Sequence, residues 1–198
     1  AGTTATIQTS TGGQGGNNLQ ASYHLPAMGG LTAGVSVGTG AVTANNEWSA
    51  FGIKYAMNTG DAAVTLGYST KTIETATAAD NDNTSMGVNV VMGAISVTAS
   101  ASTKTGVDED INTQSAGVSY DLGNGLVVAA ASVKSEDDDD AGEEYNMTTY
   151  EAAYTIASGL SAVLNVSDFD YENGTNVDAA GQVDVNGTNT SLTIKATF

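Results

Sequence analysis

One histidine and one serine are the residues of this chain that most resemble a catalytic pair. His24 is the only histidine among 198 residues, and Ser22 lies two positions before it. In an extended strand, residues two apart point to the same face. A serine beside a histidine can act as a nucleophile activated by a general base. The alternative is that both are polar side chains on the wetter face of a strand, and the choice depends on the strands described below.

Carboxylates form the second group that could do chemistry, because clustered carboxylate oxygens are the ligands that Ca²⁺ prefers. The segment 137–142 lacks the ligand that an EF-hand loop carries before its glycine, so the sequence predicts no specific metal site and no cofactor. Weak Ca²⁺ binding stays open beside the simpler interpretation of solvated charge. The residues of this acidic loop are Glu136, Asp137, Asp138, Asp139, Asp140, Glu143 and Glu144.

The composition excludes several classes of protein. Five Lys and Arg oppose 22 Asp and Glu, a formal net charge of −17 at pH 7, so no basic patch is available for nucleic acid. Cys is absent, which excludes disulfides and thiolate chemistry. No window approaches the roughly 18 consecutive apolar residues of a transmembrane helix, but strands cross membranes with a weaker signal. The 24 Gly and the single Pro suit many short strands and tight turns.

Apolar and polar residues alternate in short runs along the chain, and this period of two predicts β-strands. Short turns such as 58–61 alternate with long polar loops such as 72–84. The unit of strand, turn, strand and loop recurs about five times. With a weak strand at 1–9 included, we expect about twelve antiparallel strands in one domain that covers residues 1–198.

A soluble β-sandwich has the same period, but three features favour a barrel in a membrane. The polar faces carry small uncharged residues, the short turns and long loops alternate strictly, and the chain ends on Phe198 after Leu192, Ile194 and Ala196. These features predict an all-β fold, an antiparallel up-and-down transmembrane β-barrel with lipid outside and a watery lumen. The residues expected to line the pore are Gln20, Ser22, His24, Lys54, Thr65, Asn89, Thr98, Ser119, Glu151, Asn165 and Lys195.

The position of Phe198 also predicts the orientation of the barrel. If this residue ends a strand that descends to the periplasm, the short turns are periplasmic and the long acidic loops are extracellular. Aromatic residues near the strand ends would then form girdles at the membrane interfaces. They are Trp48, Tyr55, Tyr120, Tyr150 and Tyr154.

The closing strand and the repeated pattern resemble the Gram-negative outer-membrane porin family, in particular the alphaproteobacterial general porins. The likeness rests on the ending 189–198, on tyrosine-ended strands, and on turns such as 122–125. It implies passive diffusion of small hydrophilic solutes and ions, no enzyme activity, and a homotrimer in the lipid of the bacterial outer membrane. It also implies that the barrel assembly machinery reads Phe198 as an assembly signal.

The chain departs from this family in two respects. Such porins usually have sixteen strands, and an acidic third loop with a Pro-Glu-Phe-Gly-Gly-like stretch folds into the pore; neither is found here. No constriction residues can therefore be carried over. The chain is expected to be either a smaller barrel or the C-terminal part of a longer, sixteen-stranded one.

Two further functions are alternatives to a porin. A hydrolase on a twelve-stranded barrel occurs in the outer-membrane phospholipase family, but its His-Asp-Ser-Asn-Gly stretch is missing, and His24 falls on the expected lumen face. A secreted or surface β-rich adhesin, or a structural layer protein, remains the alternative, because low Lys, no Cys, and abundant Thr, Asn and Gly suit it equally. For the porin we expect a preference for cations, since carboxylates at a pore mouth concentrate them.

Overall fold

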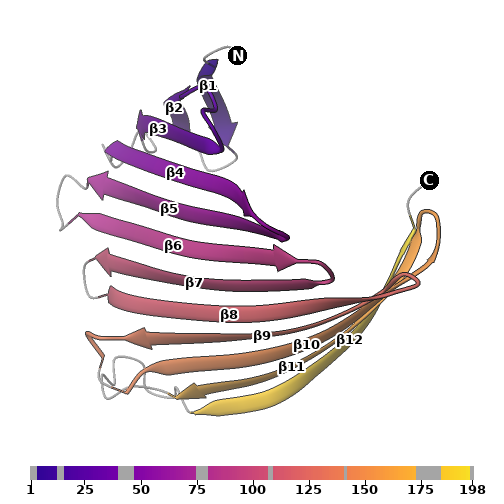
Figure 1. The fold of residues 1–198 in the computed structure, drawn as a ribbon. Coiled ribbons are helices and arrows are strands. Elements are labelled where there is room, and N and C mark those ends of the chain that lie inside the picture. The colour runs from indigo at the N-terminus through magenta and orange to yellow at the C-terminus, as the bar shows by residue number, and fades with distance from the viewer. Residues whose placement is uncertain are drawn as a thin grey trace.

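Twelve strands form a single antiparallel sheet in which each strand pairs with the next one along the chain (Figure 1). The computed structural model describes residues 4–12, 16–39, 47–74, 80–106, 109–140, 142–172 and 184–196. No helix within these ranges is long and apolar enough to cross a membrane. The strands are β1 (Thr4–Gly12), β2 (Gly16–His24), β3 (Leu31–Thr39), β4 (Glu47–Thr59), β5 (Ala62–Glu74), β6 (Asn81–Met92), β7 (Ile95–Gly106), β8 (Glu109–Gly123), β9 (Leu126–Asp137), β10 (Glu144–Ala157), β11 (Leu160–Glu172) and β12 (Val185–Ala196). The predicted up-and-down topology is confirmed.

Two-residue turns join β4 to β5, β6 to β7, β8 to β9 and β10 to β11 at one end of the sheet, while the six residues 25–30 join β2 to β3 at the same end. The turn between β8 and β9 consists of Asn124 and Gly125, which have φ angles of 53° and 80°. Two positive φ values are typical of the type I′ turn, whose twist matches that of the flanking strands. Gly60, Gly93 and Gly159 also have positive φ in the equivalent turns. We call this edge of the sheet the turn end and the opposite edge the loop end.

The strands are longer at the loop end than the sequence predicted. β5 continues to Glu74 and β6 begins at Asn81, so the expected loop 72–84 is mostly strand. In the same way β9 includes Asp137 and β11 continues to Glu172. Polar residues at these positions still pair, because the hydrogen bonds of an antiparallel ladder join backbone groups and do not require apolar side chains.

The sheet forms no packed core. No apolar residue is buried among those whose side chains are described. Leu192 and Ile194 are 68% and 65% exposed, and every strand from β2 to β12 carries at least one large apolar side chain that is also exposed. Soluble proteins rarely leave a contiguous apolar face this large open to water. A single layer with an uncovered apolar face rules out the soluble β-sandwich and requires an apolar surrounding.

The described strands curve into an open arc. β1 and β12 are the two ends of the strand order, and each pairs with one neighbour, β2 and β11 respectively. The two ends of the sheet lie apart in Figure 1. Because lipid cannot satisfy the backbone groups of an open edge, such an arc is one wall of a barrel. Phe198, the expected assembly signal, lies outside the described residues.

Candidate functional site

The cross-strand register places all eleven residues that were expected to line a pore on the same face of the sheet. Asn89 pairs with Thr65 on one side and with Thr98 on the other. Glu151 likewise pairs with Asn165. Directly paired residues point to the same face, and so do residues two apart within a strand. We call this the polar face and the opposite one the apolar face.

Hydrogen bonds between side chains run across the strands of the polar face. The amide of Asn89 donates to the hydroxyls of Thr98 at 2.8 Å and Ser96 at 3.0 Å. The hydroxyls of Ser100 and Ser115 are 2.6 Å apart. These bonds tie neighbouring strands together and hold short side chains close to the wall.

Ser22 belongs to this network. Its hydroxyl accepts hydrogen bonds from the Ser36 hydroxyl at 3.0 Å and from the amide of Gln20 at 3.2 Å. The His24 ring instead lies against Gly34. A Cβ added to Gly34 would be only 2.7 Å from the Nδ1 atom of His24. Ser22 and His24 therefore have other partners, which agrees with the polar role assigned to them from the sequence.

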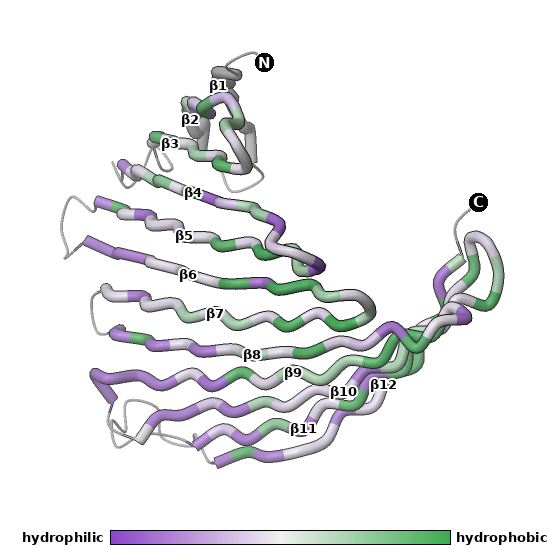
Figure 2. The backbone as a smooth tube through the Cα atoms, viewed as in Figure 1, coloured by the Kyte–Doolittle hydropathy of each residue, from purple (hydrophilic) through white to green (hydrophobic). Residues whose placement is uncertain are grey.

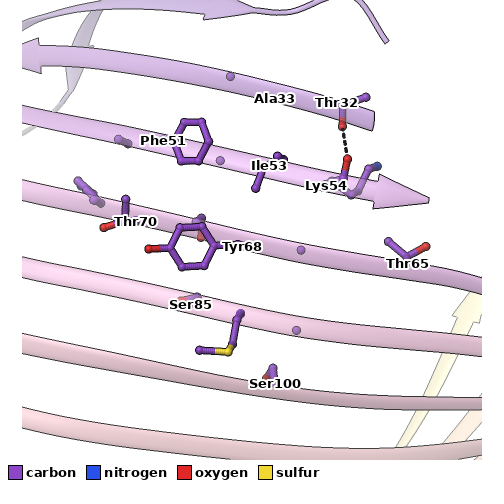
Figure 3. Close-up of a pocket in the computed structure, with 18 of the residues that line it drawn as sticks. Thr32, Ala33, Phe51, Ile53, Lys54, Thr65, Tyr68, Thr70, Ser85 and Ser100 are labelled. Atoms are coloured by element: carbon purple, nitrogen blue, oxygen red, sulfur yellow. Dashed lines mark hydrogen bonds between the residues drawn. The ribbon is translucent and has the colours of Figure 1, made fainter. Parts of the chain in front are cut away.

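A hollow of about 1110 Å³ lies along the polar face of β2 to β7. Whole rows of small residues from this face contribute to its lining, which explains why the space stays open. Figure 3 shows Thr32, Thr65, Ser85 and Ser100 around it, with the Thr32 hydroxyl bonded to the Lys54 carbonyl oxygen. A second hollow of about 840 Å³, between β5 and β10, is lined mainly by residues of the apolar face, such as Leu66, Val88 and Ala116. The polar face is therefore hollowed over β2 to β7.

The apolar face carries a belt that crosses the strands obliquely. On β4 the belt extends from Phe51 to Met57, and on β11 it extends from Leu160 to Val166. Successive pairings put Met57, at the turn end of the belt, in the same row as Val166, at its loop end. The belt therefore shifts by about 20 Å along the strands over about 34 Å across them, a tilt of about 30°.

This shift is what a flat membrane requires of tilted strands. A belt that follows the membrane plane must change rows from one strand to the next when the strands are inclined to the membrane normal. Transmembrane barrels tilt their strands by about 35–45°, close to the value found here. Figure 2 shows the same trend, with hydrophobic segments toward the turn end and hydrophilic ones toward the loop end of β8 to β12.

Beyond the belt, at the loop end, the apolar face becomes acidic. Lys134 lies here, with its Nζ atom 2.7 Å from Glu136 and 2.9 Å from Glu144. The hydrogen bonds to Glu136 and then Glu144 raise the pKa of Lys134, and the bond from Lys134 lowers the pKa of Glu144. These groups are exposed, so the pair contributes little stability. They mark where the wall leaves the hydrocarbon.

The predicted acidic loop is only partly a loop. Glu136, Asp137 and Glu144 belong to strands β9 and β10, because the hairpin extends further than the hydrophobic pattern indicated. The connection between the strands covers 138–143, where the Asp137 carboxylate accepts hydrogen bonds from the backbone amides of Asp110 and Asp139. No group of three or more His, Cys, Asp or Glu in the described ranges is arranged to hold a metal ion. Weak Ca²⁺ binding stays a prediction.

The two faces differ in charge, which the sequence analysis did not foresee. Among strand residues with described side chains, four of five lysines are on the polar face, with three acids: Lys54, Lys71, Lys104, Lys195, Asp121, Asp137 and Glu151. The apolar face holds Lys134 and nine acids: Glu47, Glu74, Asp82, Asp110, Glu136, Glu144, Asp168, Asp170 and Glu172. Nine of the twelve strand carboxylates with described side chains therefore lie on the outside of the wall.

Lys71 and Lys104 are site residues that the sequence analysis missed. Lys71 directly precedes the loop expected at 72–84, and Lys104 begins a second segment, 104–112, that the sequence predicts to be a loop. Both are in strands, and register gives both to the polar face. The alternation contained the signal, because Lys71 is three residues from Tyr68 and an odd spacing reverses the face.

One of the five aromatic residues expected in the girdles is on the wrong face. Tyr55, Tyr120, Tyr150 and Tyr154 lie on the apolar face, where a girdle would be. Trp48 pairs with Gly38 and lies on the polar face. Its indole packs against β3, and Lys71 Nζ is 5.3 Å from the ring centroid.

Comparison with known proteins agrees with this architecture. OpdO of Pseudomonas aeruginosa is 14% identical, with a TM-score of 0.71 over 98% of this chain and 58% of its own. OccAB4 of Acinetobacter baumannii is 11% identical, with a TM-score of 0.70 over 91% and 52%. An anion-selective porin from Comamonas acidovorans is 16% identical, with a TM-score of 0.65 over 89% and 57%. This chain thus spans somewhat more than half the length of these solved structures.

A search of curated proteins found no match. The family comparison is decisive, because the profile of the Gram-negative porins matches residues 1–195, nearly the whole chain. That match agrees with the polar concave face, the oblique apolar belt and the lack of buried apolar residues among the described side chains. It also makes the chain part of a channel protein of the bacterial outer membrane, and not an enzyme. The chain belongs to the Gram-negative porin family.

Proposed function

We propose that this chain forms part of the wall of a water-filled pore through which small hydrophilic solutes and ions diffuse passively. The observation that carries the proposal is the division of the sheet into a polar, concave face and an apolar belt on the other side. A wall of hydroxyl and amide groups exchanges hydrogen bonds with water and with sugars alike. Passage then needs no chemistry, only binding that is weak enough to reverse.

The proposed lining consists of the eleven residues that share the polar face, with Lys71 and Lys104 added. Asn89 and Thr98 contribute from the turn-end halves of β6 and β7. Glu151 and Asn165 contribute from the far side of the arc. Such groups select for hydrophilicity and size more than for a particular solute, which suits general diffusion.

We propose in addition that the pore prefers cations, and that the preference arises at the loop-end mouth. Support comes from the net charge of −17 and from the carboxylates that gather at the loop ends of β9 to β12. A mouth surrounded by carboxylates attracts cations and repels anions. Since most of these acids are on the outside of the wall, they act across several ångströms and are screened at a Debye length of about 8 Å. The preference should therefore fade at high salt.

Three partners belong to the same proposal: outer-membrane lipid against the apolar belt, two further copies in a homotrimer, and the barrel assembly machinery. The exposed belt supports the first. Resemblance to the porin family supports the other two. Chemical crosslinking in outer-membrane vesicles tests the trimer, and deletion of Phe198 tests the assembly signal by its effect on the amount of folded protein in the membrane.

Vesicle swelling tests the central proposal. Protein reconstituted in vesicles that contain an impermeant polysaccharide is diluted into iso-osmotic solutions of neutral sugars of increasing size. We expect swelling rates to fall smoothly with sugar size and to be absent in protein-free vesicles. Well-folded, membrane-inserted protein that gives no swelling with any sugar would contradict the proposal and favour a surface adhesin.

A further inference from the structure

Four glycines lie together on the polar face, inside the strands β3 to β6. Gly34 pairs with Gly52, and Gly67 pairs with Gly87 in the adjacent row. All four line the hollow of about 1110 Å³. Glycine inside a strand weakens the strand, and it often marks a place where a ligand or another backbone approaches closely. This group of glycines therefore needs a physical cause.

Two of the four glycines have no such cause in the structure. None of them has a positive φ angle. A Cβ on Gly34 would lie 2.7 Å from the His24 ring, and a Cβ on Gly87 would lie 3.3 Å from a backbone oxygen. In contrast, a Cβ on Gly52 would have no neighbour closer than 4.0 Å, and a Cβ on Gly67 would have none within 4 Å. The bare floor at these two positions points to a molecule that enters the hollow.

The groups around this floor offer a positive charge and two hydroxyls. Lys54 pairs with Gly67, and Thr65 and Ser69 flank Gly67 on the same face of β5. All three side chains line the hollow, and Figure 3 shows Lys54 and Thr65 there. Within the described part of the chain, no hydrogen bond or ion pair engages the Lys54 ammonium group or either hydroxyl. These groups are therefore available to a solute as hydrogen-bond donors, and the hydroxyls also as acceptors.

No carboxylate opposes Lys54 on this part of the wall. Across β2 to β7, no Asp or Glu with a described side chain lies on the polar face. Lys71 lines the loop-end side of the hollow, four residues or about 13 Å beyond Gly67 on β5. Its Nζ atom is 5.3 Å from the centroid of the Trp48 ring. The hollow therefore has a positive potential, with Lys54 as its unengaged ammonium group.

We propose that this hollow binds sugar acids, which are hydroxylated monocarboxylates, on their way through the pore. Lys54 receives the carboxylate, and Thr65 and Ser69 exchange hydrogen bonds with the hydroxyls of the solute. The bare backbone at Gly52 and Gly67 lets the carbon chain lie close to the wall. The inference rests on the proposed pore, since it names a solute class for the same polar face. It is compatible with a cation-attracting mouth, because most of the strand carboxylates are on the other face of the wall.

Gluconate and sorbitol test the need for charge, because they share a six-carbon hydroxylated chain and differ only at one end, which is a carboxylate in gluconate. Saturation-transfer NMR measures weak binding of both compounds to the protein in lipid vesicles. Gluconate should bind saturably and about fivefold more tightly than sorbitol, the effect of one contact of about 1 kcal/mol between charges in water. Equal affinities, or no saturable binding of gluconate to folded protein, would overturn the proposal.

Two lysine variants separate the site from charge in general. Lys54→Gln removes the ammonium group from the hollow and should lower the affinity for gluconate to that for sorbitol. Lys134→Gln removes the same charge from the apolar face and should leave the affinity for gluconate unchanged. Similar gluconate affinities for the two variants would refute the role of Lys54.

A double substitution tests the floor without changing any charge. Gly52→Ala combined with Gly67→Ala adds two methyl groups that no described neighbour obstructs. Thermal unfolding should occur at the same or a higher temperature, because alanine has less freedom than glycine in the unfolded chain. Gluconate binding should weaken about tenfold, because the methyl groups occupy space that the solute needs. Gly117→Ala, on the polar face of β8 and outside the hollow, is the control and should leave binding unchanged. Equal gluconate affinities for the double variant and the control would refute the site.

Vesicle swelling in neutral sugars separates this inference from the proposed function. If the wild-type protein admits neutral sugars but binds gluconate and sorbitol equally, the pore stands and the sugar-acid site is refuted. If folded, membrane-inserted protein admits no sugar, the pore itself is refuted.

Discussion

Leu164 and Asn165 offer a direct test of the two faces because they are neighbours in β11 and point to opposite sides. Leu164 pairs with Ala152 and Leu192 on the apolar belt and is 44% exposed. Asn165 pairs with Glu151 and Ser191 on the polar face. Replacement of either residue by arginine adds the same side chain at the same height, so only the surroundings differ.

The two substitutions should differ by several kcal/mol in the free energy of unfolding that they cost. At Leu164 an arginine would meet hydrocarbon, at a cost of about 2–4 kcal/mol near the midplane and less toward either interface. At Asn165 the arginine would be in water beside Glu151, where an exposed ion pair contributes about 0–1 kcal/mol in its favour. We therefore expect Leu164→Arg to be less stable than Asn165→Arg by about 2–5 kcal/mol.

Reversible urea unfolding in lipid vesicles, followed by the emission of Trp48, measures both free energies under one condition. Trp48 is on β4, far along the sheet from β11, so neither substitution changes its surroundings directly. The slope with urea should be the same in both variants if they expose the same surface. Equal destabilisation, or a less stable Asn165→Arg, would refute the assignment of the faces.

Three further predictions follow from the same register. Replacement of 137–140 by Asn should reduce cation preference at low salt and have little effect at high salt, measured as the reversal potential under a KCl gradient; an unchanged potential at low salt would place the selectivity elsewhere. Gly125→Ala should destabilise the protein by about 1 kcal/mol, because φ is +80° and the new Cβ would lie 3.1 Å from Thr155. Gly60→Ala should destabilise it less, because φ is +61° and no atom lies within 4 Å of the new Cβ. Thermal unfolding of the two variants measures the difference. On intact cells, Asp138→Cys should react with an impermeant thiol reagent and Gly159→Cys should not; the opposite result would invert the topology.

The fold could be predicted from the sequence to the extent that its signal has a period of two. Leu66 and Tyr68 alternate with Thr65 and Gly67, and this fixes both the strand and the face of each residue. All eleven predicted lining residues share one face for this reason. The turn at Asn124 and Gly125 could also be predicted, because few residues other than Asn and Gly adopt positive φ at both positions of a two-residue turn.

The loop ends of the strands could not be predicted in this way. Residues such as Thr72 and Asp82 are paired in the sheet, and their side chains are hydrogen-bonded at 2.5 Å, yet neither is apolar. Where a wall leaves the membrane, both faces meet water, so alternation no longer distinguishes a strand from a loop. For that reason the sequence did not predict that Lys104 lies on the polar face.

Trp48 was misplaced for a different reason. Its aromatic type and its position near a strand end predicted a girdle residue on the apolar face. Its spacing from Phe51 is odd, which already assigns it to the other face. The curvature of the arc and the oblique course of the belt need the register across many strands and are not visible in any one of them.

Single cysteines in β7 test the central claim, that the polar face borders a water-filled channel. The chain has no cysteine of its own, so Ser96→Cys, Val97→Cys and Thr98→Cys each introduce one thiol. Ser96 and Thr98 are on the polar face and Val97 is on the apolar belt. In planar bilayers, a charged thiol reagent should change the single-channel conductance of the Ser96 and Thr98 variants and leave that of the Val97 variant unchanged. A change confined to Val97, or no alternation among the three, would contradict the account.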